Sequence, residues 1–312
     1  MEGVNQLIAS RMASRHAPRI PEVTRHLVEA GGKRLRPILT LAAARLCGYD
    51  GDAHVKLAAT VEFIHTATLL HDDVVDESEQ RRGRPTANLL WDNKSSVLTG
   101  DYLFARAFQL MVETGSLRVL DILSNAAATI AEGEVMQLAT ANDLATGEPA
   151  YLQMIHGKTA ALFEAATQVG GVIGERPEAE IEALAAYGRA LGMAFQIVDD
   201  LLDYGGASAA LGKNTGDDFR EGKVTLPVLL AFAGADGDAA AFWRRVIERR
   251  DQADGDMDRA LELMAATGAL AETERRARAY TAEARDALTV FPPSDLRDAL
   301  DGIAEFVVAR IS

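Results

Sequence analysis

Residues 69–76 read Leu-Leu-His-Asp-Asp-Val-Val-Asp, and residues 197–203 read Ile-Val-Asp-Asp-Leu-Leu-Asp. Each stretch contains Asp-Asp-x-x-Asp, whose first and last aspartates are four positions apart and therefore share one face of a helix. The apolar neighbours indicate that both helices are largely buried. Because clustered carboxylates repel one another on a buried helix, the pattern predicts that cations compensate them.

The rest of the chain reads as helix almost throughout, with abundant alanine and leucine and no alternating strand pattern. Glycine and proline breaks divide it into roughly ten or more helices of ordinary length. No long linker interrupts the pattern, so we expect a single all-α domain over residues 1–312. Residues 234–258 are acidic and weakly patterned, and we expect them to form an excursion on the surface.

The composition is that of a globular protein with a formal net charge of −14. This acidity argues against a nucleic-acid partner, whose binding requires a basic surface. The sequence has no apolar run long enough to span a membrane and no signal peptide, so we expect a cytoplasmic protein without stable membrane insertion. The single cysteine, Cys47, lies in apolar helical sequence and is expected to be a small buried hydrophobe rather than a nucleophile.

The cation that suits the two acidic stretches is Mg²⁺. It prefers hard oxygen ligands, binds through one or two carboxylates, and completes its shell with water and phosphate oxygens. No histidine and cysteine pattern favours zinc. A single Asp-Asp-x-x-Asp is as often a solvated helix face as a metal site, but two copies in apolar sequence favour the metal site.

Basic residues lie near the acidic stretches in sequence. Residues 31–37 read Gly-Gly-Lys-Arg-Leu-Arg-Pro, and Arg81 and Arg82 follow the first aspartate motif. In so acidic a protein, cations beside a metal motif favour diphosphate binding. Taken singly, each is as well explained as a surface charge, and we expect this of Arg34, Arg84 and Arg220. His65, two helical turns before Asp72, is more often a core residue than a ligand in such a position.

These motifs resemble those of the long-chain trans-polyprenyl diphosphate synthases, close to the octaprenyl and decaprenyl types. The resemblance covers residues 30 to 230 and includes seven ordered motifs. They are residues 31–37, 69–76, 81–83, 100–103, 157–159, 195–203, and 212–214 together with 221–227. The departures are Val224, where many relatives have proline, and the lack of a basic C-terminal tail.

The resemblance implies an isoprenoid-synthase helical bundle around a deep central cavity, in a homodimer with about three Mg²⁺ ions per site. It implies that Mg²⁺ is held by Asp72, Asp76 and Asp199, with Asp73, Asp200 and Asp203 supporting them directly or through water. Isopentenyl diphosphate would be bound by Lys33, Arg36, His65 and Arg82. The allylic diphosphate would be held by Arg81, Lys158, Thr159, Gln196, Lys213 and Lys223. Lys158 and Gln196 join the aspartates in the catalytic set, because a main-chain carbonyl near Lys158 and the Gln196 amide are suited to stabilise an allylic cation.

The expected product length depends on the residues one helical turn before the first aspartate motif. The residues one turn before Asp72 are Thr68 and Ala67, both small, whereas short-chain members of the resembled family place aromatic side chains there. We therefore expect an open tunnel and an octaprenyl to decaprenyl product, with decaprenyl preferred (roughly C40 to C50). We expect Phe104, Phe108 and Met111 to line the deeper wall of the tunnel, although plain core packing explains each of them equally well. The resemblance further implies a ubiquinone side chain as the destination.

Several alternatives stay open at this point. A short-chain synthase making farnesyl or geranylgeranyl diphosphate shares the motifs and differs in the tunnel. A terpene cyclase replaces the second aspartate motif and lacks residues 31–37, and a non-catalytic subunit of a heteromeric synthase has usually lost one motif. A helical scaffold without a ligand leaves the paired motifs unexplained.

Overall fold

The computed structural model describes the chain except for residues 15, 30, 206–215 and 312. The described residues are almost entirely helical, which confirms the all-α prediction. They form two compact units, which we call the first unit (residues 1–127 and 165–185) and the second unit (residues 128–164 and 186–312). The expectation of one domain stays a prediction.

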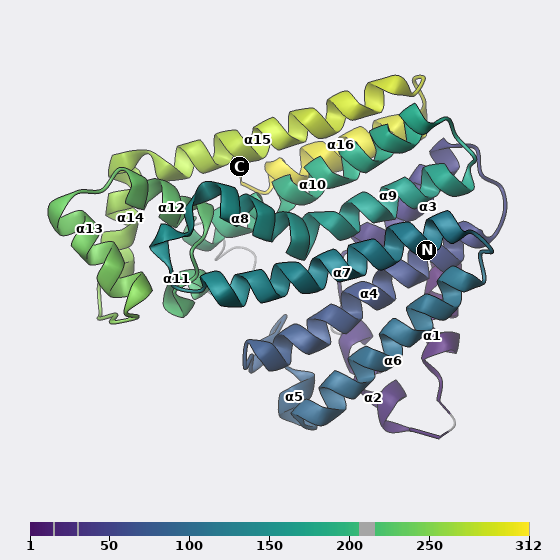
Figure 1. Ribbon diagram of the computed structural model, residues 1–312, viewed down its shortest axis with the longest axis horizontal. Helices are drawn as coiled ribbons and strands as arrows, with labels where there is room; N and C mark the ends of the chain where they lie inside the picture. The colour runs from purple at the N-terminus through teal and green to yellow at the C-terminus, as the bar shows by residue number, and fades with distance from the viewer. Residues whose placement is uncertain (15, 30, 206–215, 312) are drawn as a thin grey trace. The chain divides into compact units, whose positions relative to one another are not determined.

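The first unit begins with helices from the N-terminal third of the chain (Figure 1). They are α1 (Glu2–Met12), α2 (Arg19–Glu29), α3 (Leu35–Leu46), α4 (Ala53–Val75), α5 (Ala87–Leu90) and α6 (Asn93–Val112). Three further helices contribute to both units: α7 (Leu117–Thr140), α9 (Ala161–Ile173) and α10 (Glu178–Tyr204).

Helix α4 is the centre of the first unit and packs against α1, α3 and α6. It contains no glycine or proline, and Leu57, Val61 and Ile64 are fully buried along it, as expected for a core helix. It approaches α6 at Gly100, where a β-carbon would clash with the ring of His71. This close approach explains the glycine before Asp101.

A short hairpin follows α4 and carries two candidate arginines. Strands β1 (Gln80–Arg81) and β2 (Arg84–Pro85) are antiparallel, with Arg81 paired to Arg84. The two turn residues, Arg82 and Gly83, have φ angles of 54° and 72°. Positive φ at both central positions is the requirement of a type I′ turn. The sequence pattern did not predict this hairpin, because two-residue strands give no alternation.

The second unit contains the C-terminal half of the fold. Its elements are η1 (Leu144–Thr146), α8 (Gly147–Ile155), η2 (His156–Ala160), α11 (Asp217–Glu221), α12 (Leu226–Ala233), α13 (Gly237–Trp243), η4 (Arg244–Glu248), α14 (Asp256–Thr267), α15 (Ala269–Ala287), η5 (Leu288–Val290) and α16 (Asp295–Ala309). Helix α15 packs against α12 and α16 (Figure 1).

The expectation that residues 234–258 form a surface excursion is wrong. Trp243, Val246 and Ile247 are fully buried in one apolar cluster with Val228 and Met264. Tryptophan buries a large apolar area, so this segment anchors part of the second unit. The weak pattern misled because the apolar residues are concentrated within a single short run.

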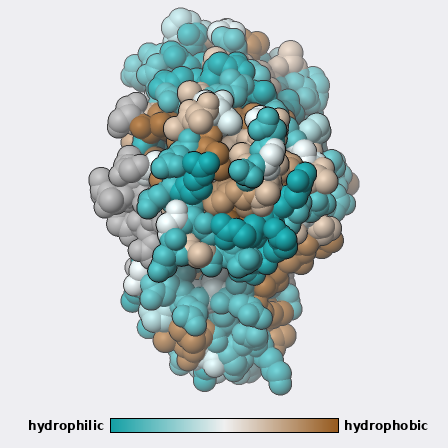
Figure 2. Space-filling model, turned by 90° about the vertical axis from the view of Figure 1, so that its left-hand side faces the viewer, coloured by the Kyte–Doolittle hydropathy of each residue, from teal (hydrophilic) through white to brown (hydrophobic). Residues whose placement is uncertain are grey.

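The surface agrees with the composition. The face in Figure 2 is mostly hydrophilic, with smaller hydrophobic areas between the polar ones. Among the described helices, none combines the length and the apolar character needed to cross a bilayer. Cys47 is buried, and burial raises the pKa of its thiol to about 11, which confirms its interpretation as a buried hydrophobe.

Candidate functional site

The first aspartate motif forms the C-terminal end of α4. Asp72 is partly buried, Asp73 is fully buried, and Asp76 is the exposed C-cap residue. The last turn of α4 contains no basic residue. Because the C-terminal end of a helix already carries partial negative charge, three carboxylates there are unfavourable without a cation. The donor chemistry and the location therefore both fit Mg²⁺.

Arg81 supplies part of the compensation. Its Nε and Nη2 both donate to Oδ1 of Asp73, each at 2.8 Å. A buried carboxylate that is paired in this way is held in one orientation. In this structure Arg81, which the resemblance assigns to the allylic diphosphate, therefore fixes the middle aspartate of the motif.

A cationic cluster lies elsewhere in the first unit. Arg36 and His65 are partly buried and Arg82 is exposed, and a β-carbon on Gly32 would lie 2.8 Å from Nη1 of Arg82. The pKa of His65 is well below its ordinary value, first because of burial and then because Arg36 and Arg82 are near. The structure thus brings together Arg36, His65 and Arg82, three of the four residues assigned to isopentenyl diphosphate. Lys33, the fourth, is exposed on the same loop.

Arg34 departs from the expectation of a surface charge. Its side chain is only 17% exposed, and its Nη1 donates to Oε1 of Glu62, which is buried on α4. Sequence reasoning missed Glu62, although an isolated acid in an apolar helix three residues before His65 was the available signal. Arg220, by contrast, is exposed and pairs with Asp217, which confirms its expected place on the surface.

The second aspartate motif lies in the last turns of α10, which also lack a basic residue. Asp200 is buried and accepts hydrogen bonds from Oη of Tyr151 at 2.6 Å and from Nε2 of Gln196 at 2.8 Å. Oε1 of Gln196 in turn accepts from Oγ1 of Thr159 at 2.8 Å. This network brings together three predicted residues and adds Tyr151, whose distance in sequence gave no signal.

The other two aspartates of this motif have different partners. Asp203 accepts from the backbone N–H groups of Asp217 at 3.2 Å and Asp218 at 3.0 Å. Asp199 accepts from Nη2 of Arg310 at 2.6 Å. Arg310, two residues from the end of the chain, was also missed, because a single arginine did not read as a basic tail.

Burial shifts the titration of this group. Burial, and then repulsion from Asp218, raise the pKa of Asp200 to about 8 and that of Asp203 to about 6. A carboxylate that resists ionisation in this way is stabilised in its charged form by a nearby cation. The acidic end of α10 therefore also fits Mg²⁺, although its electrostatic setting differs from that of α4.

Lys158 and Thr159 lie on η2, a single turn of π-helix. Nζ of Lys158 donates to Glu134 at 2.9 Å, and such turns recur at functional sites. A β-carbon on Gly157 would lie 3.0 Å from the backbone of Gly133 on α7. The glycine before Lys158 thus allows η2 to pack directly on α7. Of the remaining predicted lysines, Lys223 lies within 3.3 Å of Asp218, and Lys213 lies outside the described residues.

The proposed tunnel residues differ in how far they are exposed. Ala67 and Met111 are fully buried, and Thr68 is partly buried. Phe104 is stacked on His71, with ring centroids 6.0 Å apart. Phe108 is 43% exposed, and its expected place on the deeper wall of the tunnel stays a prediction. The role of Ala67, Thr68 and Met111 in chain length stays a prediction.

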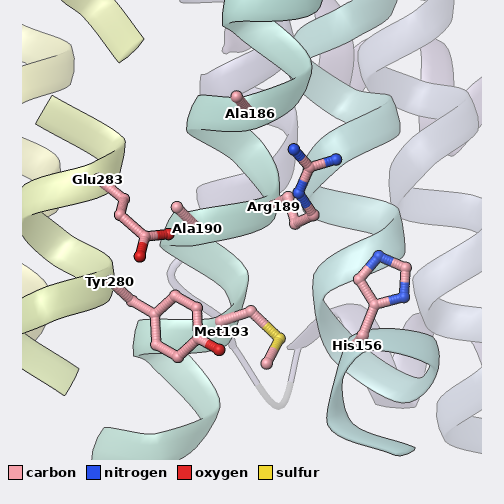
Figure 3. A pocket seen from close by; sticks show the side chains of 7 residues that line it. All are labelled: His156, Ala186, Arg189, Ala190, Met193, Tyr280 and Glu283. Carbon is pink, nitrogen blue, oxygen red and sulfur yellow. The ribbon is translucent and has the colours of Figure 1, made fainter. Parts of the chain in front are cut away.

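A pocket of about 330 Å³ lies in the second unit (Figure 3). None of the predicted site residues lines it. Arg189 and His156 lie on one side and Tyr280 and Glu283, from α15, on the other, while Arg189 and His156 both contact Glu164. The pocket therefore does not coincide with the residues predicted from the sequence.

Comparison with known proteins gives consistent matches over the whole chain. The family described as "Polyprenyl synthetase" matches residues 17–264. The octaprenyl diphosphate synthase of Escherichia coli K12 is 47% identical, covering 99% of this chain and 95% of that protein. The structure of a decaprenyl diphosphate synthase from Rhodobacter capsulatus has a TM-score of 0.97 and 67% identity, covering 100% of this chain and 96% of that one. That of a Caulobacter crescentus polyprenyl synthase, complexed with calcium and isoprenyl diphosphate, has a TM-score of 0.94 and 55% identity, covering 100% and 95%.

Proposed function

The chain belongs to the polyprenyl synthetase family and is a prenyltransferase, and from this premise we propose that it adds isopentenyl diphosphate units to an allylic diphosphate such as farnesyl diphosphate. The product is a long all-trans polyprenyl diphosphate, with a decaprenyl chain preferred. One observation carries the proposal: both aspartate motifs are intact, and each ends a helix that has no basic residue in its last turn.

Four carboxylates are proposed to hold Mg²⁺: Asp72 and Asp76 on α4, and Asp199 and Asp203 on α10. When bound, Mg²⁺ neutralises the charge that develops on the leaving diphosphate. The Caulobacter relative, which was crystallised with calcium and isoprenyl diphosphate, supports a divalent cation in this role. The resemblance implies about three Mg²⁺ ions per site, and the proposal includes this number.

The other predicted site residues are proposed to bind and orient the two substrates. Lys33, Arg36, His65 and Arg82 are proposed to bind isopentenyl diphosphate, with His65 neutral because its pKa is lowered. The ion pair between Asp73 and Arg81 holds both side chains in place. The amide of Gln196 donates a hydrogen bond to Asp200 and accepts one from Thr159, and these two bonds hold the amide in one orientation. Holding an amide dipole in one orientation before reaction is the condition for electrostatic stabilisation of an allylic cation. The same cation requires a site from which water is excluded.

We also propose that the protein forms a homodimer. A homodimer is supported by exposed apolar side chains at heptad-like spacing on α6, where Leu98 and Val112 are each 65% exposed and Phe108 lies between them. The ubiquinone side chain as destination rests on the resemblance alone, and the cytoplasmic location rests on the expectation from the sequence.

Product analysis tests the proposed function. Purified protein is incubated with Mg²⁺, farnesyl diphosphate and isopentenyl diphosphate, and the products are sized by mass spectrometry. Octaprenyl to decaprenyl products are expected. Products that stop at geranylgeranyl length would overturn the chain length and keep the reaction, whereas no elongation by folded protein would favour a non-catalytic subunit.

A further inference from the structure

Buried Glu62 is unusual in its surroundings. It is 8% exposed in the middle of α4, between the buried residues Val61 and Phe63. A carboxylate is rarely buried unless it is paired, because burial removes its hydration. Its partner is Arg34, whose side chain is 17% exposed and whose Nη1 donates directly to Oε1 of Glu62.

Arg34 also has an unusual backbone. It is the N-cap residue of α3, with φ of 50° and ψ of 33°, in the left-handed region. A residue other than glycine or asparagine seldom adopts this conformation, so the surrounding contacts must hold it. The ion pair to Glu62 is such a contact, because it joins the loop before α3 to the rigid centre of α4.

The cations assigned to isopentenyl diphosphate surround this pair. Lys33 and Arg36 flank Arg34 in the chain, and His65 lies one helical turn after Glu62. Arg82 approaches the same loop at Gly32, where a β-carbon would lie 2.8 Å from Nη1 of its guanidinium. Arg34, Arg36 and Arg82 each favour ionisation of Glu62 and so lower its pKa, although burial raises that pKa more.

Like charges gathered in this way repel one another in the absence of an anionic substrate. Glu62 places a negative charge beside these cations through its pair with Arg34. We infer that Glu62 is a positioning residue: through Arg34 it fixes the loop of residues 31–36 and offsets the repulsion among the cations that bind isopentenyl diphosphate. The inference rests on the proposed function of this cluster and assigns Glu62 and Arg34 no contact with substrate.

The decisive variant is Glu62→Gln, which keeps the size of the side chain and removes its charge. We expect the KM for isopentenyl diphosphate to rise about tenfold or more, because loss of a buried charge-assisted pair misplaces the binding groups. The KM for farnesyl diphosphate should stay within about twofold of the wild-type value. Glu62→Asp, which keeps the charge on a shorter stem, should recover part of the loss.

Three controls separate this role from plain stability. Glu180→Gln removes a comparable carboxylate, 18% exposed and paired with Arg176 in the same unit, and should leave both KM values unchanged. Glu62→Gln combined with Arg34→Met should cost no more than either substitution alone, because both remove the same pair. If Glu62→Gln does not fold by circular dichroism, Arg34→Met carries the test, since it removes the charge that is paired with Glu62, and an unchanged KM for isopentenyl diphosphate in that variant would overturn the positioning role.

The outcomes are distinct. Wild-type protein that neither elongates nor binds isopentenyl diphosphate by calorimetry would refute the proposed function itself. Active wild type with a folded Glu62→Gln variant whose KM for isopentenyl diphosphate is unchanged would overturn the positioning role. An equal rise in both KM values, accompanied by a lower melting temperature, would assign Glu62 to stability alone.

Discussion

The acidic ends of α4 and α10 carry the same Asp-Asp-x-x-Asp pattern in different electrostatic surroundings. On α4 the middle aspartate, Asp73, is paired with Arg81 from a hairpin only eight residues further along the chain. On α10 the middle aspartate, Asp200, accepts from two neutral donors among the described residues, Tyr151 and Gln196, and has a pKa raised to about 8. A shared motif therefore does not specify a shared charge state, because the neighbouring residues decide it.

The outer aspartates differ in a similar way. Asp76 is the exposed C-cap residue of its helix. Asp203, by contrast, accepts hydrogen bonds from two backbone N–H groups and lies near the carboxylate of Asp218. Asp218 raises the pKa of both Asp200 and Asp203. The α10 end thus concentrates more negative charge in a more buried place, and we expect it to depend more strongly on the cation.

Removal of a metal-binding carboxylate from either end should have the largest effect. We expect Asp72→Asn and Asp199→Asn each to lower kcat on the order of a thousandfold, because each removes charge that holds Mg²⁺ at the leaving group. The Mg²⁺ requirement should rise more for Asp199→Asn than for Asp72→Asn. Steady-state turnover at a series of Mg²⁺ concentrations measures both quantities.

Asp121→Asn is a suitable control for this comparison, because Asp121 is exposed on α7 and its carboxylate accepts a hydrogen bond from the neutral amide of Asn125. It should behave as wild type. Activity above about a tenth of wild type in either motif variant would contradict the proposed metal role. Equal Mg²⁺ dependence in both would show that the different surroundings have no functional consequence.

The residues one turn before each motif differ as well. Thr68 stands before Asp72, whereas Phe195 occupies the equivalent place before Asp199 and lies over Phe163, with ring centroids 5.6 Å apart. Thr68→Phe therefore gives α4 the aromatic residue that α10 has. We expect it to shorten the product to roughly half its length, because a bulky side chain closes the proposed tunnel. Ala67→Phe should act in the same direction.

Mass spectrometry of the products tests this prediction, with the melting temperature as a check on overpacking. Ala271→Phe introduces the same ring at an exposed position on α15 and should leave the product unchanged. A folded Thr68→Phe variant that makes the wild-type product would exclude Thr68 from the tunnel.

The sequence was sufficient for the elements that depend on local pattern. Helical periodicity predicted the all-α class, and the motif residues Thr159, Gln196 and Asp200 prove to be in direct contact. It was insufficient where long-range packing decides the environment. Arg34 looked like a surface charge because its partner, Glu62, lies 28 residues away, and Arg310 is 111 residues from Asp199.

Substitution of Arg310 should have the smallest effect of these variants. It tests directly how the acidic end of α10 binds Mg²⁺. Its guanidinium side chain is 11% exposed and lies over the ring of Phe195 at 5.2 Å. It donates to Asp199, but its Nε and Nη1 have no hydrogen-bond partner among the described residues. A buried guanidinium with unpaired donors is poorly compensated, so this pair should yield readily to a stronger cation.

We therefore expect Arg310→Gln to bind Mg²⁺ more tightly in the absence of substrates, by about threefold, because the ion no longer displaces a positive charge from Asp199. Isothermal titration with Mg²⁺ alone measures this without reference to turnover. Arg278→Gln, which removes an exposed arginine paired with Glu274 on α15, should bind as wild type. Weaker Mg²⁺ binding by Arg310→Gln would mean that the guanidinium orients Asp199 for the ion instead of competing with it, and the two acidic helix ends would then be alike in having an arginine that prepares the motif.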